Sequence, residues 1–69
     1  MTLADAVEAR PDDLVEGHGC AWGGTIVKTA PEMRAVAVRV DDPRLSGIEK
    51  GLVLGFSIYE VDIVLRCDA

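Results

Sequence analysis

The chain has 69 residues, a hydrophobic fraction of 49% and a formal net charge of −5. This length allows one domain spanning residues 1–69, and the hydrophobic fraction is sufficient for a packed core and argues against a disordered chain. The negative charge argues against direct binding of nucleic-acid phosphates, and no apolar run approaches the ~20 residues that cross a bilayer.

The N-terminal segment predicts a short helix from Leu3 to about Ala9. Thr2 is a hydroxyl residue suited to the N-cap, and Asp5 follows three residues later, as in a capping box. Pro11 disfavours helical backbone at the residue before it and so ends the helix. The face expected to pack against the rest of the domain consists of Leu3, Ala6 and Val7.

A glycine-rich stretch and two strands are expected next. Residues 17–25 hold four glycines and predict a loop or a distorted strand. The segment Thr25–Thr29 predicts a short strand, after which Pro31 breaks the pattern. Residues 34–40 alternate most clearly, which predicts a strand with one apolar face formed by Val36, Val38 and Val40.

A second short helix is predicted over Arg44–Lys50. The preceding Asp41-Asp42-Pro43 combines acidic capping residues with a proline suited to the first helical turn. Gly51 fits the left-handed residue that follows a helix C-terminus. The side chains that this helix would turn inward are Leu45 and Ile48.

Residues 52–66 predict a long strand or hairpin arm whose alternation changes phase. Apolar residues occupy even positions up to Ile58 and odd positions from Tyr59 onward. Because a shift of one residue exchanges the two faces of a strand, a β-bulge near these two residues would be needed. The alternative is a strand buried on both faces at its start and on one face afterwards.

The order of these elements predicts an α+β fold, a small antiparallel sheet with one or two short helices. Only three aromatic residues are present, so we expect an aliphatic core. The predicted core comprises Val36, Val38, Val40, Leu45, Ile48, Leu54, Phe56 and Ile58.

The densest charge feature is the N-terminal region. Residues 1–18 contain one arginine and five acids, which are Asp5, Glu8, Asp12, Asp13 and Glu16. One interpretation is that these acids keep a small domain soluble. The other is that they bind the basic surface of a protein partner, including a surface that otherwise holds nucleic acid.

A zinc site could be assembled only from His18, Cys20, Cys67 and Asp68, since zinc takes nitrogen, sulfur and oxygen ligands. The chain has no Cys-x-x-Cys pair and no phosphate-loop motif, so we expect neither a metal nor a cofactor. No basic region followed by an apolar stretch marks a signal peptide, which favours the cytoplasm. In that compartment the two cysteines are expected to be free thiols.

The segment Gly55-Phe-Ser-Ile58 follows two others, Val36-Ala-Val-Arg-Val-Asp41 and Ile48-Glu-Lys-Gly51. In this order and spacing the three segments resemble the XkdF-like family of phage prohead serine proteases, over residues 28–58. The resemblance implies an assemblin-like protein that acts in a bacterial host.

By the same resemblance, Ser57 is the candidate nucleophile, and a histidine that precedes it in the chain would activate it. His18 is the only histidine and has the right chain order. The family's own histidine lies in a longer upstream segment. The resemblance therefore implies a truncated core without its base.

Three functions remain as hypotheses. The first is a non-catalytic interaction protein of phage or mobile-element type, which binds and blocks a host protein such as the basic nucleic-acid-binding surface of a defence complex. The second is a prohead protease fragment with Ser57 and His18 as a dyad. The third is a structural domain that forms a homodimer through its C-terminal strand. An enzyme without its base and its substrate-positioning loops has little means of lowering a barrier, which favours the first.

Overall fold

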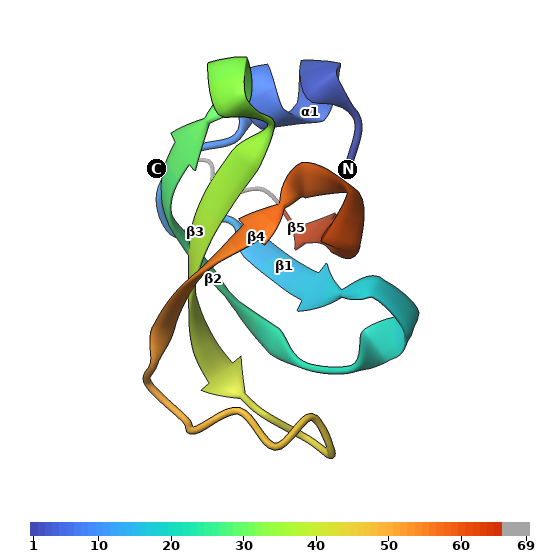
Figure 1. The fold of residues 1–69 in the computed structure, drawn as a ribbon, viewed down its shortest axis with the longest axis vertical. Helices are drawn as coiled ribbons and strands as arrows, with labels where there is room; N and C mark the ends of the chain where they lie inside the picture. Colours follow the sequence, from blue (N-terminus) through green and yellow to red (C-terminus); the bar gives the residue numbers. More distant parts are fainter. Residues whose placement is uncertain (66–69) are drawn as a thin grey trace.

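The computed structural model describes residues 1–65, which form a five-stranded antiparallel sheet with one short helix (Figure 1). The strands are β1 (Leu14–Gly17), β2 (Gly23–Ala30), β3 (Ala35–Asp42), β4 (Val53–Ser57) and β5 (Val61–Leu65). The helix is α1 (Leu3–Glu8), and the 3₁₀ turns are η1 (His18–Cys20), η2 (Pro31–Met33) and η3 (Ile58–Glu60). This architecture confirms the predicted α+β class, with the sheet as the larger part.

The strands lie in the order β4-β3-β2-β1-β5, and each is antiparallel to its neighbours. β4 and β5 are consecutive in the chain, yet they occupy opposite edges of the sheet. The three residues of η3 can join the two edges only because the sheet twists and curls round on itself, as the ribbon shows (Figure 1). The sheet therefore wraps around the core like a partly open barrel.

α1 begins with the predicted capping box. The N–H of Asp5 donates to the Thr2 hydroxyl, and the N–H of Thr2 donates to the Asp5 carboxylate, both at 3.1 Å. Of the predicted inward face, Ala6 is buried, but Leu3 and Val7 are exposed. The helix packs against the sheet through Ala6, and the larger side chains of Leu3 and Val7 remain outside the core. None of the helices in residues 1–65 has the length and apolar character that crossing a membrane requires.

The second predicted helix, over Arg44–Lys50, does not form, and irregular turns connect β3 to β4 instead. Side-chain bonds of Ser46 compete with helical backbone bonds here. Its hydroxyl donates to the Pro43 carbonyl at 2.6 Å and accepts the N–H of Ile48 at 3.2 Å. Gly47 then adopts a left-handed φ of +79°, which a helix cannot contain.

The change of alternation near Ile58 marks a break between two strands rather than a bulge in one. The Ser57 hydroxyl accepts the N–H of Tyr59 at 3.3 Å and so caps η3. Ile58 is fully buried in this turn, and Val61 begins β5 buried in the core. The expected single strand over residues 52–66 is therefore wrong. The apolar alternation does change phase at η3, where the chain leaves β4 and turns into β5.

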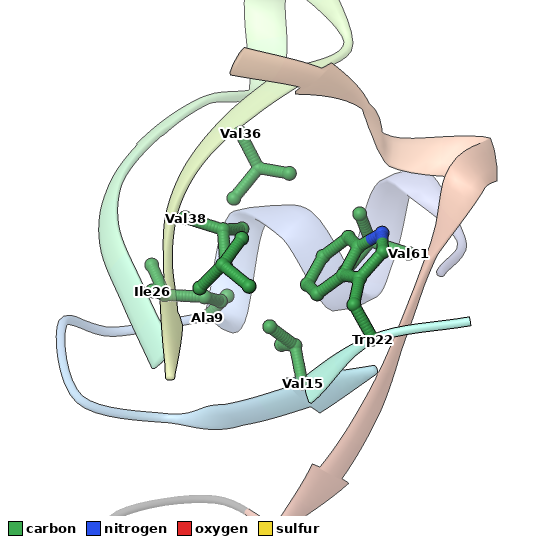
Figure 2. Packing of buried hydrophobic residues seen from close by; sticks show 8 residues of the cluster. Ala9, Val15, Trp22, Ile26, Val36, Val38 and Val61 are labelled. Carbon is green, nitrogen blue, oxygen red and sulfur yellow. The ribbon is translucent and has the colours of Figure 1, made fainter. Parts of the chain in front are cut away.

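The buried cluster fills the interior of the curled sheet (Figure 2) and consists of Ala9, Val15, Trp22, Ile26, Val36, Val38, Val40 and Val61. The predicted positions of the three β3 valines and of Ile58 are confirmed. Phe56 and Ile48 are partly buried and pack against the cluster, and Leu54 is half-buried. The prediction for Leu45 is wrong: this side chain is fully exposed because the helix that would turn it inward does not form.

Trp22 is the largest core side chain, and it lies in the glycine-rich stretch that predicts a loop or a distorted strand. The ring is 5% exposed, lies between Val15 and Val61 (Figure 2) and stacks on Phe56 with 4.6 Å between ring centroids. Gly17 makes room for it, because a Cβ atom at this glycine would lie 2.4 Å from Nε1 of the indole. Gly17 thus admits a buried aromatic side chain.

Candidate functional site

The two residues of the predicted dyad lie on different elements and have different partners. Ser57 ends β4, and its hydroxyl oxygen accepts a hydrogen bond from Tyr59. His18 begins η1, and its largely exposed ring places Nδ1 3.8 Å from Oδ2 of Asp62. Within residues 1–65 no hydrogen bond joins Ser57 to His18. The dyad stays a prediction.

Half of the candidate zinc set lies within the described residues. His18 and Cys20 both belong to η1 and are exposed, whereas Cys67 and Asp68 lie outside the described part of the chain. Cys20 is a free thiol. Among residues 1–65 no group of three or more His, Cys, Asp or Glu side chains is arranged to hold a metal ion.

The five N-terminal acids occupy different environments. Asp5 belongs to the capping box, whereas Glu8 and Asp12 are exposed. Asp13 is 1% exposed, and its Oδ2 accepts the backbone N–H of the residue three positions earlier at 2.9 Å. This placement removes Asp13 from any surface that a partner could contact. Glu16, on β1, is the member that lies beside acids from other strands.

Glu16 is the centre of a line of carboxylates across the outer face of the sheet. It pairs with Asp62 of β5 on one side and with Gly23 of β2 on the other, and Gly23 pairs with Asp42 of β3. Residues directly opposite each other in adjacent strands point to the same face. We call Asp62, Glu16 and Asp42 the acidic row; Gly23 occupies the gap in it.

Arg44 lies over this gap and neutralises part of the row. Its Nη1 donates to Glu16 Oε2 at 2.7 Å and to the Cys20 carbonyl at 2.9 Å. Its Nε donates to Asp42 Oδ2 at 3.2 Å. A Cβ atom on Gly23 would lie 3.2 Å from Nη2, so glycine leaves room for the guanidinium. The hydrogen bonds to Glu16 and then to Asp42 raise the pKa of Arg44 above its ordinary value, so the group stays charged.

A shallow groove of about 300 Å³ lies beside the acidic row. Leu14 and Val64 form an apolar wall, and two glycines of β2 contribute to its floor. The charged lining consists of three acids and one base, which are Glu16, Asp41, Asp42 and Arg44. The side chains of lysine and arginine combine an apolar stem with a charged head. The groove therefore suits the side chain of a basic residue better than an anion.

Glu16 and Asp62 face each other as like charges. Arg44 contacts Glu16 from the β2 side. On the other side, the Met1 ammonium lies 3.7 Å and the His18 ring 3.8 Å from Asp62. No ion pair among residues 1–65 bridges the two carboxylates. Like charges directly opposite destabilise a sheet, so a cation placed between these two groups would be favourable.

Sequence reasoning singled out Glu16 but missed the other two members of the row. Asp42 belongs to the segment predicted to begin a helix, and Asp62 lies in the segment predicted as one long strand. The missing information is strand order: β1 lies between β2 and β5, which brings the three acids together. Alternation within one strand cannot supply this order.

Comparisons with protein-family models, with curated proteins and with solved structures found no match for the chain. The likeness of residues 28–58 to the XkdF-like proteases therefore stays a prediction. Function is argued below from the site, since a fold by itself does not specify one.

Proposed function

We propose that this chain is a non-catalytic interaction protein whose acidic row binds a basic surface of a protein partner. The observation that carries the proposal is the like-charge pair of Glu16 and Asp62 on β1 and β5, which no ion pair among residues 1–65 bridges. Each carboxylate has a positive partner on its outer side, but the repulsion between the two remains unfavourable. A lysine or arginine of a partner placed between the two carboxylates would turn this repulsion into attraction.

The groove beside the row supports the same interpretation. Its apolar wall, Leu14 and Val64, can cover the aliphatic stem of a basic side chain while the carboxylates hold the charged head. Arg44, which also lines the groove, fixes Glu16 and Asp42 in place. Side chains held before binding lose less conformational entropy when the partner arrives.

The non-catalytic part of the proposal is supported by the surroundings of Ser57. An activated serine needs a general base within hydrogen-bond reach. The Ser57 hydroxyl instead accepts the N–H of Tyr59, while the Nδ1 atom of His18 faces Asp62. These contacts are consistent with a capping role for the serine and with a position of the histidine beside Asp62.

The identity of the partner as a host protein rests on the resemblance to phage proteins. In this form of the proposal, the acidic row occupies a basic surface that otherwise holds nucleic acid, and so blocks it. A negatively charged face suits this role, because it complements the charges that bind phosphates. Competition between the chain and nucleic acid for the same partner would be the expected consequence.

A labelled lysine- and arginine-rich peptide is a suitable first probe, with binding followed by fluorescence anisotropy over a salt series. The variant Glu16→Gln/Asp62→Asn removes two charges from the row but keeps amide oxygens as acceptors. Two exposed ion pairs of 0.2–1 kcal/mol each predict a loss of affinity of roughly 2- to 30-fold at low salt. The loss should shrink as salt screens the charges.

The matched control is Glu32→Gln/Glu49→Gln, which changes the net charge by the same amount on η2 and on the β3–β4 connection. A second variant, Glu8→Gln/Asp12→Asn, tests the exposed acids of the N-terminal region. Equal losses in all three variants would show that only overall charge matters. That result would remove the acidic row as a binding site.

A further inference from the structure

β4 has one hydrogen-bonding side that faces no other strand in the described part of the chain. The pairing with β3 places Val36 opposite Phe56 and Val38 opposite Leu54. In the same register, the N–H of Ile58 donates to the carbonyl of residue 34, and the N–H of residue 40 donates to the carbonyl of residue 52. Since hydrogen-bonded pairs alternate along an antiparallel ladder, the even-numbered residues of β4 bond to β3.

The odd-numbered residues of β4 therefore direct their backbone groups away from the sheet. These are Val53, Gly55 and Ser57, which together present three N–H and three C=O groups at the edge. All three residues are exposed, and a Cβ atom on Gly55 would meet nothing within 4 Å, so the outer face of β4 is open at its centre. Within residues 1–65 no second strand pairs with the outward backbone groups.

The edge also lacks the features that usually prevent strand association. Natural edge strands carry lysine, proline, inward-pointing charges or bulges. Residues 51–59 contain none of these residue types and no charge at all, and Leu52 and Val53 are exposed apolar side chains. The nearest charges along the chain are Lys50 at one end and Glu60 at the other.

We propose that two copies of this chain associate by antiparallel pairing of their β4 strands about a two-fold axis at Gly55. A two-fold dimer uses the same surface on both copies, so the edge must complement itself. With Gly55 opposite its own copy, Val53 of each chain lies opposite Ser57 of the other. Every backbone group that β4 directs outward then has a partner, which gives a ladder of six hydrogen bonds in this register.

The same register brings complementary side chains together. On the inner face, Leu54 of each copy lies opposite Phe56 of the other, and both side chains are only half-buried in the single chain. Aliphatic and aromatic side chains directly opposite each other stabilise a sheet. Lys50 precedes β4 in a turn and Glu60 follows it in η3, so antiparallel pairing brings the positive flank of one copy to the negative flank of the other. A shift of the register by two residues would lose a backbone pair and both of these matches.

The proposed ladder uses the backbone groups of Val53, Gly55 and Ser57, and none of these residues belongs to the acidic row on β1, β3 and β5. The inference is therefore separate from the proposed function. A dimer would display two acidic rows, and a partner with two basic surfaces would bind it with increased avidity.

The first test compares Gly55→Pro with Gly55→Ala in the full chain, under reducing conditions because Cys20 is exposed. Proline removes the outward N–H at the centre of the proposed ladder but no bond to β3. Alanine retains that N–H. Sedimentation equilibrium from micromolar to millimolar concentration should show wild type and Gly55→Ala approaching twice the 7.4 kDa of one chain, with Gly55→Pro monomeric. Circular dichroism checks that the proline variant remains folded.

The second test exchanges charges and does not depend on tolerance of proline. Lys50→Glu places two glutamates together at each end of the ladder, and Glu60→Lys places two lysines together. Each single change should weaken the dimer by roughly tenfold, since two symmetry-related pairs change from attraction to repulsion. The double variant Lys50→Glu/Glu60→Lys restores both pairs and should recover wild-type association.

A wild-type chain that stays monomeric at every concentration would overturn the proposal. A dimer that Gly55→Pro leaves intact, in a variant that remains folded, would also overturn it. So would a double charge variant no tighter than the single variants, because Lys50 and Glu60 would then not face each other across the interface.

Discussion

Gly17→Ala is expected to destabilise the protein through its contact with Trp22. The added Cβ atom would lie 2.4, 2.7 and 2.8 Å from Nε1, Cε2 and Cδ1 of the indole. The ring cannot swing away freely, because it is buried and stacked on Phe56. Gly17 has φ of −66° and ψ of 150°, which alanine adopts without strain, so the effect comes from the side-chain contact alone.

Overpacking of this kind costs about 1–3 kcal/mol. For a domain of this size, each 1 kcal/mol lowers the melting temperature by about 4–8 °C. In a Trp22→Leu background the indole is absent, and the same methyl group should cost much less. A double-mutant cycle should therefore give a coupling energy of about 1–3 kcal/mol.

The assay is urea unfolding followed by far-UV circular dichroism, which reports on all four proteins of the cycle, including those without tryptophan. Gly55→Ala is the matched control, because its Cβ atom meets no neighbour and it too replaces a strand glycine. This control should be as stable as wild type or slightly more so. The reasoning fails if Gly17→Ala matches wild type, or if it costs as much in the Trp22→Leu background.

Three further outcomes are expected. Asp13→Ala removes a buried acceptor of the Arg10 N–H and should lower the free energy of unfolding by about 1–3 kcal/mol. The midpoint of urea unfolding measures this change, and an unchanged midpoint would contradict the expectation. Leu45→Ala should change the free energy of unfolding by less than about 0.5 kcal/mol, because the side chain is exposed. Ile58→Ala removes a fully buried side chain and should cost about 2–5 kcal/mol. A larger cost for Leu45→Ala than for Ile58→Ala would contradict the exposure of Leu45 and the burial of Ile58. A reactive serine phosphonate should not label the protein, and stoichiometric labelling that Ser57→Ala abolishes, read by intact mass, would instead support a peptidase.

Local signals in the sequence predicted the parts of the fold that depend on local interactions. The Thr2 capping box involves two residues three positions apart. The buried face of β3 follows from strict alternation of its three valines. Gly51 has the expected left-handed backbone, with φ of +88°, although a turn precedes it instead of a helix. In each case neighbouring residues contain the whole reason.

The prediction failed where a side chain competed with the backbone or a distant contact decided the outcome. The cap signals at residues 41–43 favoured a helix, but the Ser46 hydroxyl and the left-handed Gly47 stabilised turns instead. Trp22 is buried because Gly17 leaves room for the ring and Phe56 stacks on it from another strand. Neither contact can be read from the glycine-rich stretch alone.

In the candidate site too, the local feature could be predicted from the sequence, whereas the contacts between strands could not. Glu16 was recognisable as part of an acidic segment. Its relation to Asp42 and Asp62 depends on β1 lying between two strands that come later in the chain. The burial of Asp13, two residues after Pro11, likewise depends on the turn between α1 and β1.

The pairing of β1 with β5 constrains the order in which the protein can fold during synthesis. Strands β1 to β4 pair with strands that are consecutive in the chain, but the outer edge of β1 stays unpaired until residues 61–65 have left the ribosome. Until then Val61 cannot pack beside Trp22 (Figure 2). Pairings between distant segments are slow to form, so we expect the pairing of β1 with β5 to be the last step of folding. Asp62 arrives with β5, and the acidic row is therefore assembled in that same last step.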